Sequence, residues 1–270
     1  MHIYAVGASR NIGYYAALRF LAKGDTVTIV VRNPANLEQD PALKDHVASG
    51  KARLFKADAT SSEDMQAAWE GANQVAPVDV VLFTVGATTA TLSLTKGFIV
   101  HPHDLCTRAL FTVVRTIQSR QPNQPIPKLV ALSSTGLTPA TKRVLPLLLR
   151  PLYGWALHAA HDDKRGMESI IFNGLGQQYE AGQTPGDHIM PANWEQELRA
   201  QAPSDGLWGP RSVIIRAAFL TDGEGSGRYR AEKGDFSTYT VARRDVAHFI
   251  VEKLVPDWEK YEGGVVTVGN

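Results

Sequence analysis

The hydrophobic and polar positions of the first 22 residues change their period at a glycine turn. Residues 2–6 form an apolar run, and after the turn Tyr14, Ala17, Leu18 and Leu21 recur at spacings of three, four and seven residues. A short apolar run is consistent with a buried strand, and the later recurrence is typical of an amphipathic helix. The pattern therefore predicts a strand, a tight loop and a helix, in that order.

Further strands are predicted along the chain: mainly apolar runs at residues 26–31, 78–85, 128–132, 213–216 and 265–268, and a shorter, more polar strand at 53–58. Strands that are covered on both faces form continuous apolar runs, as in parallel sheets with helices on both sides. Helical patterns lie between several of the runs, with a helix start at 60–63 and an apolar stripe over 106–117. We therefore predict one α/β domain over residues 1–270, a doubly wound parallel Rossmann sheet with helices on both faces.

Three segments lack this alternation of strands and helices. Residues 88–101 are rich in Thr and have no clear period, so we expect a loop beside the pocket. Residues 139–155 are apolar and punctuated by proline, and a helix is expected after them over about 158–172. Residues 173–210 are rich in Gly and Pro, with one short helix expected at about 194–200. An irregular insertion of this length is often a lid beside the substrate, and a surface insertion is the alternative.

Composition and charge restrict the partners of the chain. The formal net charge is +1 over 270 residues and the charges are spread along the sequence, so nothing indicates nucleic acid or a membrane surface. No apolar run approaches the roughly 20 residues of a spanning helix. A first strand at His2 leaves no room for a signal peptide, and the single cysteine, Cys106, is compatible with a reducing compartment. We expect a soluble, cytoplasmic protein with a small-molecule partner and predict no oligomeric state.

The turn after the first strand has the residue types that a pyrophosphate needs. A pyrophosphate binds backbone N–H groups at a helix N-terminus, and bulky side chains in the turn would hold the backbone away. We expect the following residues of the turn to bind a dinucleotide: Gly7, Ser9, Arg10, Asn11, Ile12 and Gly13. A glycine turn that simply connects a strand to a helix is the alternative.

Arg32, at the end of the second predicted strand, indicates which dinucleotide binds. A carboxylate at this place accepts hydrogen bonds from the adenosine ribose, whereas an arginine pairs with a 2′-phosphate. Arg10 would supply a second arm of the same clamp. The pair favours NADP(H) over NAD(H), and the alternative is that both are solvated loop arginines.

Further candidates follow the third and fourth strands. Asp58, with Ala59 after it, ends the third strand, where an adenine amino group would lie in such a fold. Val85, Gly86 and Ala87 end the fourth strand at the expected cofactor edge. Gly86 permits close approach of the backbone to a ribose, and an ordinary turn is the alternative.

Ser133 and Ser134 follow the fifth predicted strand. Ligands of open parallel sheets bind outside the carboxyl ends of the strands, so we place both hydroxyls at the reacting end of the pocket. Lys164 lies on the apolar stripe of its predicted helix, and an inward ammonium needs an acceptor, which a cofactor ribose would supply. His161 would present an imidazole to the same pocket, and a structural role is the alternative.

The three charged neighbours of Lys164 on that helix are not expected to take part in the site. Asp162, Asp163 and Arg165 are expected to be mainly solvated.

The order of these motifs resembles the atypical short-chain dehydrogenase/reductases, especially the NmrA-like and biliverdin reductase B (flavin reductase)-like branch. The resemblance spans nearly the whole chain, and its specific pieces are residues 7–13, Val31-Arg32-Asn33-Pro34, Asp58-Ala59-Thr60, Ser133-Ser134, Lys164 with Met167-Glu168, and Arg243 with Asp245-Val246-Ala247. It implies a Rossmann sheet that binds NADP, with Asp58 near the adenine. It also implies Gly86 and Ala87 near the adenosine ribose, and Ser134 and Lys164 near the nicotinamide.

The chain departs from this family at three positions. Asn11 replaces the middle glycine of the turn, a change we expect binding to survive because Asn tolerates left-handed backbone. Ala160 stands where active members place a tyrosine, four residues before the lysine, so the usual phenol–lysine acid pair is missing. Ala217 stands where relatives usually carry proline.

These observations predict an NADPH-dependent reductase that transfers hydride to a small conjugated acceptor, such as a flavin, a quinone or an enone. Ser134, assisted by Ser133, would bind the acceptor, Lys164 would anchor the ribose, and His161 or water would supply the proton. Acceptors that need little acid assistance suit a site without the tyrosine. The alternatives are a non-catalytic NADP-binding regulator of the NmrA-like type and a redox-neutral isomerase or dehydratase.

Overall fold

The structure is a computed structural model of the chain. It describes residues 1–86, 90–93, 97–119, 124–147, 158–180, 183–200 and 211–270.

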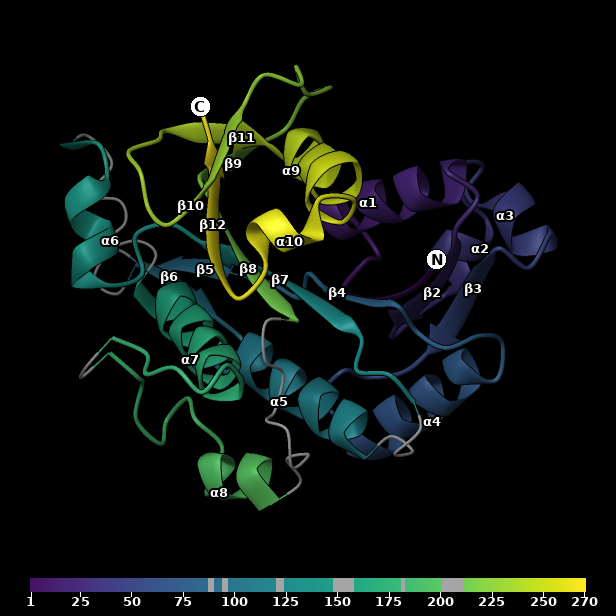
Figure 1. Cartoon of the computed structure of the whole chain (residues 1–270), viewed down its shortest axis with the longest axis horizontal. Helices are drawn as coiled ribbons and strands as arrows, with labels where there is room; N and C mark the ends of the chain where they lie inside the picture. Colours follow the sequence, from purple (N-terminus) through teal and green to yellow (C-terminus); the bar gives the residue numbers. More distant parts are fainter. Residues whose placement is uncertain (87–89, 94–96, 120–123, 148–157, 181–182, 201–210) are drawn as a thin grey trace.

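An eight-stranded sheet forms the middle layer of the protein (Figure 1). Its strands lie in the order β10 (Arg230–Lys233), β12 (Gly264–Gly269), β8 (Ser212–Ala217), β7 (Lys128–Ser134), β4 (Val80–Phe83), β1 (His2–Val6), β2 (Thr26–Val31) and β3 (Ala52–Lys56). All neighbours are parallel except the antiparallel pair β10–β12. This confirms the predicted doubly wound sheet. Because β1 pairs with β2 on one side and β4 on the other, the strand order reverses at β1, where ligands of such sheets bind.

Helices cover both faces of the sheet (Figure 1). One face carries α1 (Asn11–Ala22), α9 (Arg243–Phe249), the π-helical segment η3 (Ile250–Leu254) and α10 (Trp258–Tyr261). The other face carries α4 (Ser62–Asn73), α5 (Leu105–Gln118) and α7 (His158–Gly174). Shorter helices lie in the connections, namely α2 (Ala35–Glu38), α3 (Lys44–Ala48), α6 (Pro139–Val144) and α8 (Trp194–Ala200). In the described part of the chain, no helix has the length and apolar content to cross a bilayer.

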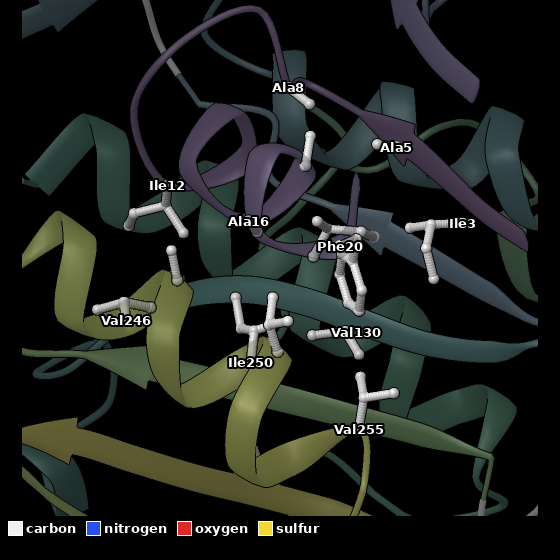
Figure 2. Packing of buried hydrophobic residues seen from close by; sticks show 14 of the residues in the cluster. Ile3, Ala5, Ala8, Ile12, Ala16, Phe20, Val130, Val246, Ile250 and Val255 are labelled. Carbon is white, nitrogen blue, oxygen red and sulfur yellow. The ribbon is translucent and has the colours of Figure 1, made fainter. Parts of the chain in front are cut away.

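The apolar core on the α1 side fixes the first helix against the sheet. Figure 2 shows Phe20 of α1 beside Ile3 of β1 and Val130 of β7, and all three are buried. Ile250 and Val255 close the same cluster from the C-terminal helices. Full burial of one such side chain stabilises the fold by about 1.5–3 kcal/mol. This packing sets the position of the turn that joins β1 to α1.

The expected loop over 88–101 is wrong. Within it, β5 (Ala90–Ser93) pairs antiparallel with β6 (Gly97–Val100). Thr is frequent in strands, but β5 alternates apolar and polar residues over only four positions and β6 does not alternate, so the pattern was too short to indicate a hairpin. A second small sheet, in which β9 (Phe219–Thr221) and β11 (Thr240–Ala242) are parallel, was also not predicted.

The segment over 173–210 agrees with its prediction where the structure describes it. The helix α7 ends at Gly174, and α8 is the single short helix expected there. Residues 181–182 and 201–210 lie outside the described residues. The lid therefore stays a prediction.

Candidate functional site

A cavity of about 360 Å³ opens at the carboxyl ends of β1, β2, β3 and β4, at the reversal of strand order. Of the predicted cofactor-binding residues, it is lined by Gly7, Ser9, Arg10, Asn11, Ile12, Gly13, Arg32, Asp58, Ala59, Val85 and Gly86. Ala87 lies outside the described residues, and Lys164 stands behind the wall of the cavity. The structure thus brings together residues from four separate chain segments that the sequence singled out.

Two glycines bring the β1–α1 turn against the end of β4. Gly7 has φ +88°, and a Cβ placed on it would lie 2.6 Å from the backbone nitrogen of Val85. A Cβ on Gly13 would meet the Thr84 hydroxyl and lie 2.8 Å from the Ala8 Cα. Any larger residue at either position would push the turn away from β4. The glycines therefore keep bare backbone at the floor of the cavity.

The start of α1 leaves its amides open toward the cavity. Arg10, at the N-cap, has extended backbone and makes no capping hydrogen bond with its side chain. The first N–H groups of a helix have no partner within the helix, so these amides suit an anion. Asn11 has φ +57°, which confirms that it takes the left-handed backbone of the glycine it replaces.

The charged side chains around the cavity are mostly arginines. Arg10, Arg32, Arg108 and Arg243 line it, and among the described lining residues Asp58 is the one carboxylate. The backbone N–H of Thr60, 2.8 Å from Asp58 Oδ1, holds the pKa of Asp58 below its usual range, with help from the Thr60 hydroxyl and the charge of Arg32. The cavity therefore favours a ligand with several negative charges.

Two of these arginines were not predicted at the site. Arg243 begins α9 and pairs with Asp222 at 2.8 Å. Arg108 lies in the first turns of α5, on the polar side of the apolar stripe. A signal for Arg108 did exist, because the helix after the fourth strand of such a sheet begins at the ligand edge.

Lys164 connects the ends of two neighbouring strands. Its ammonium donates to the carbonyl of Val85 at 2.9 Å, just after β4, and to the carbonyl of Leu132 in β7 at 2.8 Å. Both Val85 and Leu132 line the cavity. The inward Lys predicted from the apolar stripe is thus present, but backbone carbonyls are its acceptors in this structure.

The two serines of β7 point to different surroundings. Ser133 is buried and donates to Glu168 Oε1 at 2.6 Å, and Ser134 is half-buried and donates to the carbonyl of Thr135 at 3.2 Å. Neither serine lines the cavity. The prediction set both serines after the end of the strand, but β7 continues through Ser134, so successive side chains leave opposite faces. In this structure the Ser133 hydroxyl is engaged by an interior carboxylate, and its expected assistance to a bound acceptor stays a prediction.

Of the three charged residues expected to be mainly solvated, Asp162 and Asp163 are buried and Arg165 is half-buried. Asp163 is 2% exposed, and its two carboxylate oxygens accept from the backbone N–H groups of Cys106 and Thr107, each at 2.8 Å. It therefore caps the start of α5 from the neighbouring helix. Asp162 is buried in an ion pair with Arg165. His161 is also buried and does not line the cavity.

A charge network with a buried centre at Glu168 and Arg216 lies behind Ser133, and no local sequence pattern indicates it. Arg216 of β8 donates to both oxygens of Glu168 at 3.0 and 2.6 Å, and to both oxygens of Asp235 at 3.1 and 2.9 Å. The Tyr179 hydroxyl donates to Glu168 at 3.2 Å, and burial, followed by the Glu168 charge, raises the pKa of Tyr179. The network joins α7 to the end of β8, next to the strand that carries Ser134.

The chain matches a protein-family model and a curated reductase. The family model described as short chain dehydrogenase matches residues 1–154. The chain is 29% identical to the reductase pytE of Aspergillus terreus over 170 residues, which are 60% of this chain and 54% of that protein. It therefore spans about half the length of this curated relative.

Two solved structures are similar over the whole chain. A short-chain dehydrogenase/reductase from Veillonella parvula in complex with NADP has a TM-score of 0.64 at 14% identity, covering 100% of this chain and 94% of that chain. The anaerobillin reductase ChuY from Escherichia coli O157:H7 has a TM-score of 0.61 at 17% identity, covering 100% of this chain and 97% of that one. At these identities the likeness shows the shared fold.

Proposed function

We infer the function of this chain from one premise, that it belongs to the short-chain dehydrogenase family. We propose that it is an NADPH-dependent reductase of the atypical, NmrA-like or biliverdin reductase B-like type. Its acceptor would be a small conjugated molecule such as a flavin, a quinone or an enone. The observation that carries this proposal is the convergence of the glycine turn, the open helix start and four arginines on one cavity.

The residues of the cavity fit an NADP(H) molecule. Gly7 and Gly13 keep bare backbone beside the start of α1, which suits the pyrophosphate. Arg10 and Arg32 line the same cavity and would pair with the 2′-phosphate, since planar guanidinium groups suit phosphate oxygens. The excess of arginine over carboxylate would balance the charge of the three phosphates. When bound, this cofactor supplies the hydride.

Lys164 and Ser134 would position the acceptor near the cavity wall that Val85 and Leu132 form. Lys164 holds these two wall residues by their carbonyls and places a positive charge behind them. Ser134, at the end of β7, would turn its hydroxyl from the Thr135 carbonyl to the acceptor. Because Ala160 carries no hydroxyl and His161 is buried away from the cavity lining, we assign the proton to water. Such a site suits acceptors that need little acid assistance.

The relatives support the class of reaction. The names reductase and anaerobillin reductase belong to two of the similar proteins, and a third similar structure contains NADP. We propose a small-molecule substrate, no nucleic-acid or membrane partner, and a cytoplasmic location, in line with the single buried Cys106. We also propose that the segment over 173–210 acts as a lid.

A non-catalytic NADP-binding regulator is the second candidate. The observations that favour it are Ala160 at the tyrosine position and the engagement of the Ser133 hydroxyl by Glu168. Both reduce the hydroxyl chemistry available at the reacting end. A redox-neutral isomerase or dehydratase would use the same cavity, with the cofactor regenerated in each cycle.

Loss of NADPH absorbance separates the candidates. The protein is incubated with NADPH and a panel of flavins, quinones and enones, and NADPH binding is measured in parallel by titration. Consumption above the enzyme-free background supports the reductase. Tight binding without consumption across the panel would overturn the reductase and favour the regulator. An absence of NADPH binding would overturn both.

A further inference from the structure

Arg108 lines the cavity, but the function proposed above assigns it no contact with a particular part of the dinucleotide. It lies on α5, which packs with α4 and α7 on the face opposite α1 and α9 (Figure 1). Arg10 and Arg32, in contrast, come from the turn before α1 and the end of β2. The cavity is therefore approached by guanidinium groups from two different walls.

The side chain of Arg108 is available to a ligand. It is 50% exposed, and in the described part of the structure its ion pair is with Asp104 of the preceding turn, at 3.9 Å. An exposed pair at that distance contributes little free energy. A ligand in the cavity would therefore displace it at small cost.

The α5 wall is suited to a flat, partly apolar group. Leu105 and Arg108 both line the cavity, and residues three apart share one face of a helix. An arginine presents an apolar stem and a planar guanidinium, which stacks on aromatic rings. The wall formed by Leu105 and Arg108 therefore offers a surface that a planar base can cover.

Asp58 relates this wall to the rest of the site. Asp58 lines the same cavity as Arg32 and Arg108, and the positive charges of both arginines help to lower the pKa of its carboxyl. On the proposed function, Arg10 and Arg32 take the 2′-phosphate and the start of α1 takes the pyrophosphate. The face of the adenine ring then has no assigned partner, and Asp58 is the residue expected to contact its amino group.

We propose that Arg108 is an adenine-binding residue, stacking its guanidinium on the face of the base with Leu105 extending the contact. This inference rests on the proposed function, because it assumes an adenine dinucleotide in the cavity. It divides recognition between two arginines. Arg32 distinguishes NADPH from NADH through the phosphate, and Arg108 binds the base that both dinucleotides share.

Equilibrium binding tests this division of roles. Dissociation constants for NADPH, NADH and adenosine 2′,5′-bisphosphate are measured by calorimetry for the wild type, Arg108→Ala and Arg108→Lys. We expect Arg108→Ala to raise all three constants by a similar factor, about fivefold for one cation–π contact of about 1 kcal/mol. The ratio of the NADPH and NADH constants stays unchanged. Arg108→Lys keeps the charge but loses the planar group, so it restores less than half of the lost affinity.

Arg115→Ala is the matched control. Arg115 lies on the same helix, pairs with Glu197 at 2.9 Å and does not line the cavity. Its substitution is expected to leave all three constants unchanged, and thermal unfolding checks that each variant is folded.

Four results would overturn the assignment. Unchanged constants in Arg108→Ala exclude a contact with the ligand. A loss confined to the ligands with a 2′-phosphate, or full restoration by Arg108→Lys, makes Arg108 a phosphate residue instead. If the wild type binds none of the three ligands, the proposed function fails and this inference with it. Binding by the wild type together with unchanged constants in Arg108→Ala removes this inference alone.

Discussion

The hydroxyl of Ser133 donates a 2.6 Å hydrogen bond to Glu168, a carboxylate that is 0% exposed. Of two adjacent serines at the end of β7, one therefore belongs to the protein interior. Ser134 is the serine whose hydroxyl bonds only to a neighbouring carbonyl in the described contacts. The two residues should respond differently to the same substitution.

Ser133→Ala is expected to affect stability, and Ser134→Ala to affect turnover. Loss of the donor to a buried carboxylate costs about 1–3 kcal/mol of unfolding free energy. Loss of one neutral hydrogen bond to the acceptor lowers kcat by about tenfold. Denaturant unfolding and steady-state kinetics measure the two effects. A larger kcat loss in Ser133→Ala than in Ser134→Ala would contradict this assignment.

Arg216→Met is expected to destabilise the fold strongly. The substitution leaves Glu168 buried without its guanidinium partner, and removing one member of a buried ion pair typically costs about 3–5 kcal/mol. Arg230→Met is the control, because Arg230 pairs with Glu232 on the surface, where both are exposed. Urea unfolding of both variants makes the measurement. Equal unfolding free energies of the two variants would show that the Arg216–Glu168 pair does not stabilise the fold.

Gly86→Ala is expected to weaken nucleotide binding without affecting the fold. Gly86 lines the cavity, and a Cβ placed on it meets nothing within 4 Å of the protein. The added methyl group would instead meet a ligand, and an overpacked contact of about 1–3 kcal/mol raises the NADPH dissociation constant about tenfold. Gly264→Ala, also in open space, is the control outside the cavity. Unchanged binding in Gly86→Ala supports an ordinary turn.

Arg32→Ala is expected to change the choice of dinucleotide. Loss of a charge-assisted bond of about 1.5–3 kcal/mol raises the NADPH dissociation constant by tenfold or more and leaves that for NADH near its wild-type value. Parallel titrations with both dinucleotides give the ratio. The clamp assignment fails if the ratio is the same in wild type and variant.

Tyr14 is expected to make stability fall at alkaline pH. Its hydroxyl donates to Asp40 at 2.6 Å, and partial burial, then this hydrogen bond, raises the pKa of Tyr14 to about 12. Because the folded pKa lies above the unfolded value of about 10, the contribution is complete below pH 10 and is lost as pH rises towards 12. The difference in unfolding free energy between wild type and Tyr14→Phe should therefore shrink over this range. A constant difference would contradict the shift.

Local patterns predicted the parts of the fold that depend on local order. The continuous apolar runs gave β1 and β2 with their observed bounds, and the glycine turn gave the cavity floor, because both depend on residues close in sequence. The hairpin β5–β6 was missed because β5 alternates apolar and polar residues over only four positions and β6 does not alternate. Its hydrogen bonds join backbone groups, which are the same for nearly all residue types and so leave no pattern in the sequence.

Contacts of charged side chains with partners far away in the sequence could not be predicted from local patterns. Asp163 and Thr107 are 56 residues apart, and Glu168 and Arg216 are 48 apart. A charged residue on a helix is usually solvated, so its local pattern indicates a surface position. Only the packing of α7 against α5 and the end of β8 turns these residues inward. Arg108 was missed because the ligand-edge position of the start of α5 does not by itself show which side chain of the helix lines the cavity.

Lys164 is positioned by main-chain atoms, and this has a consequence for residue 160. An ammonium anchored to two carbonyl oxygens keeps its place whatever side chain stands one helical turn earlier. The phenol of active relatives can thus be absent here without loosening the lysine. By the same logic, Ala160→Tyr would place a phenol one helical turn before an ammonium that the main chain already holds in position.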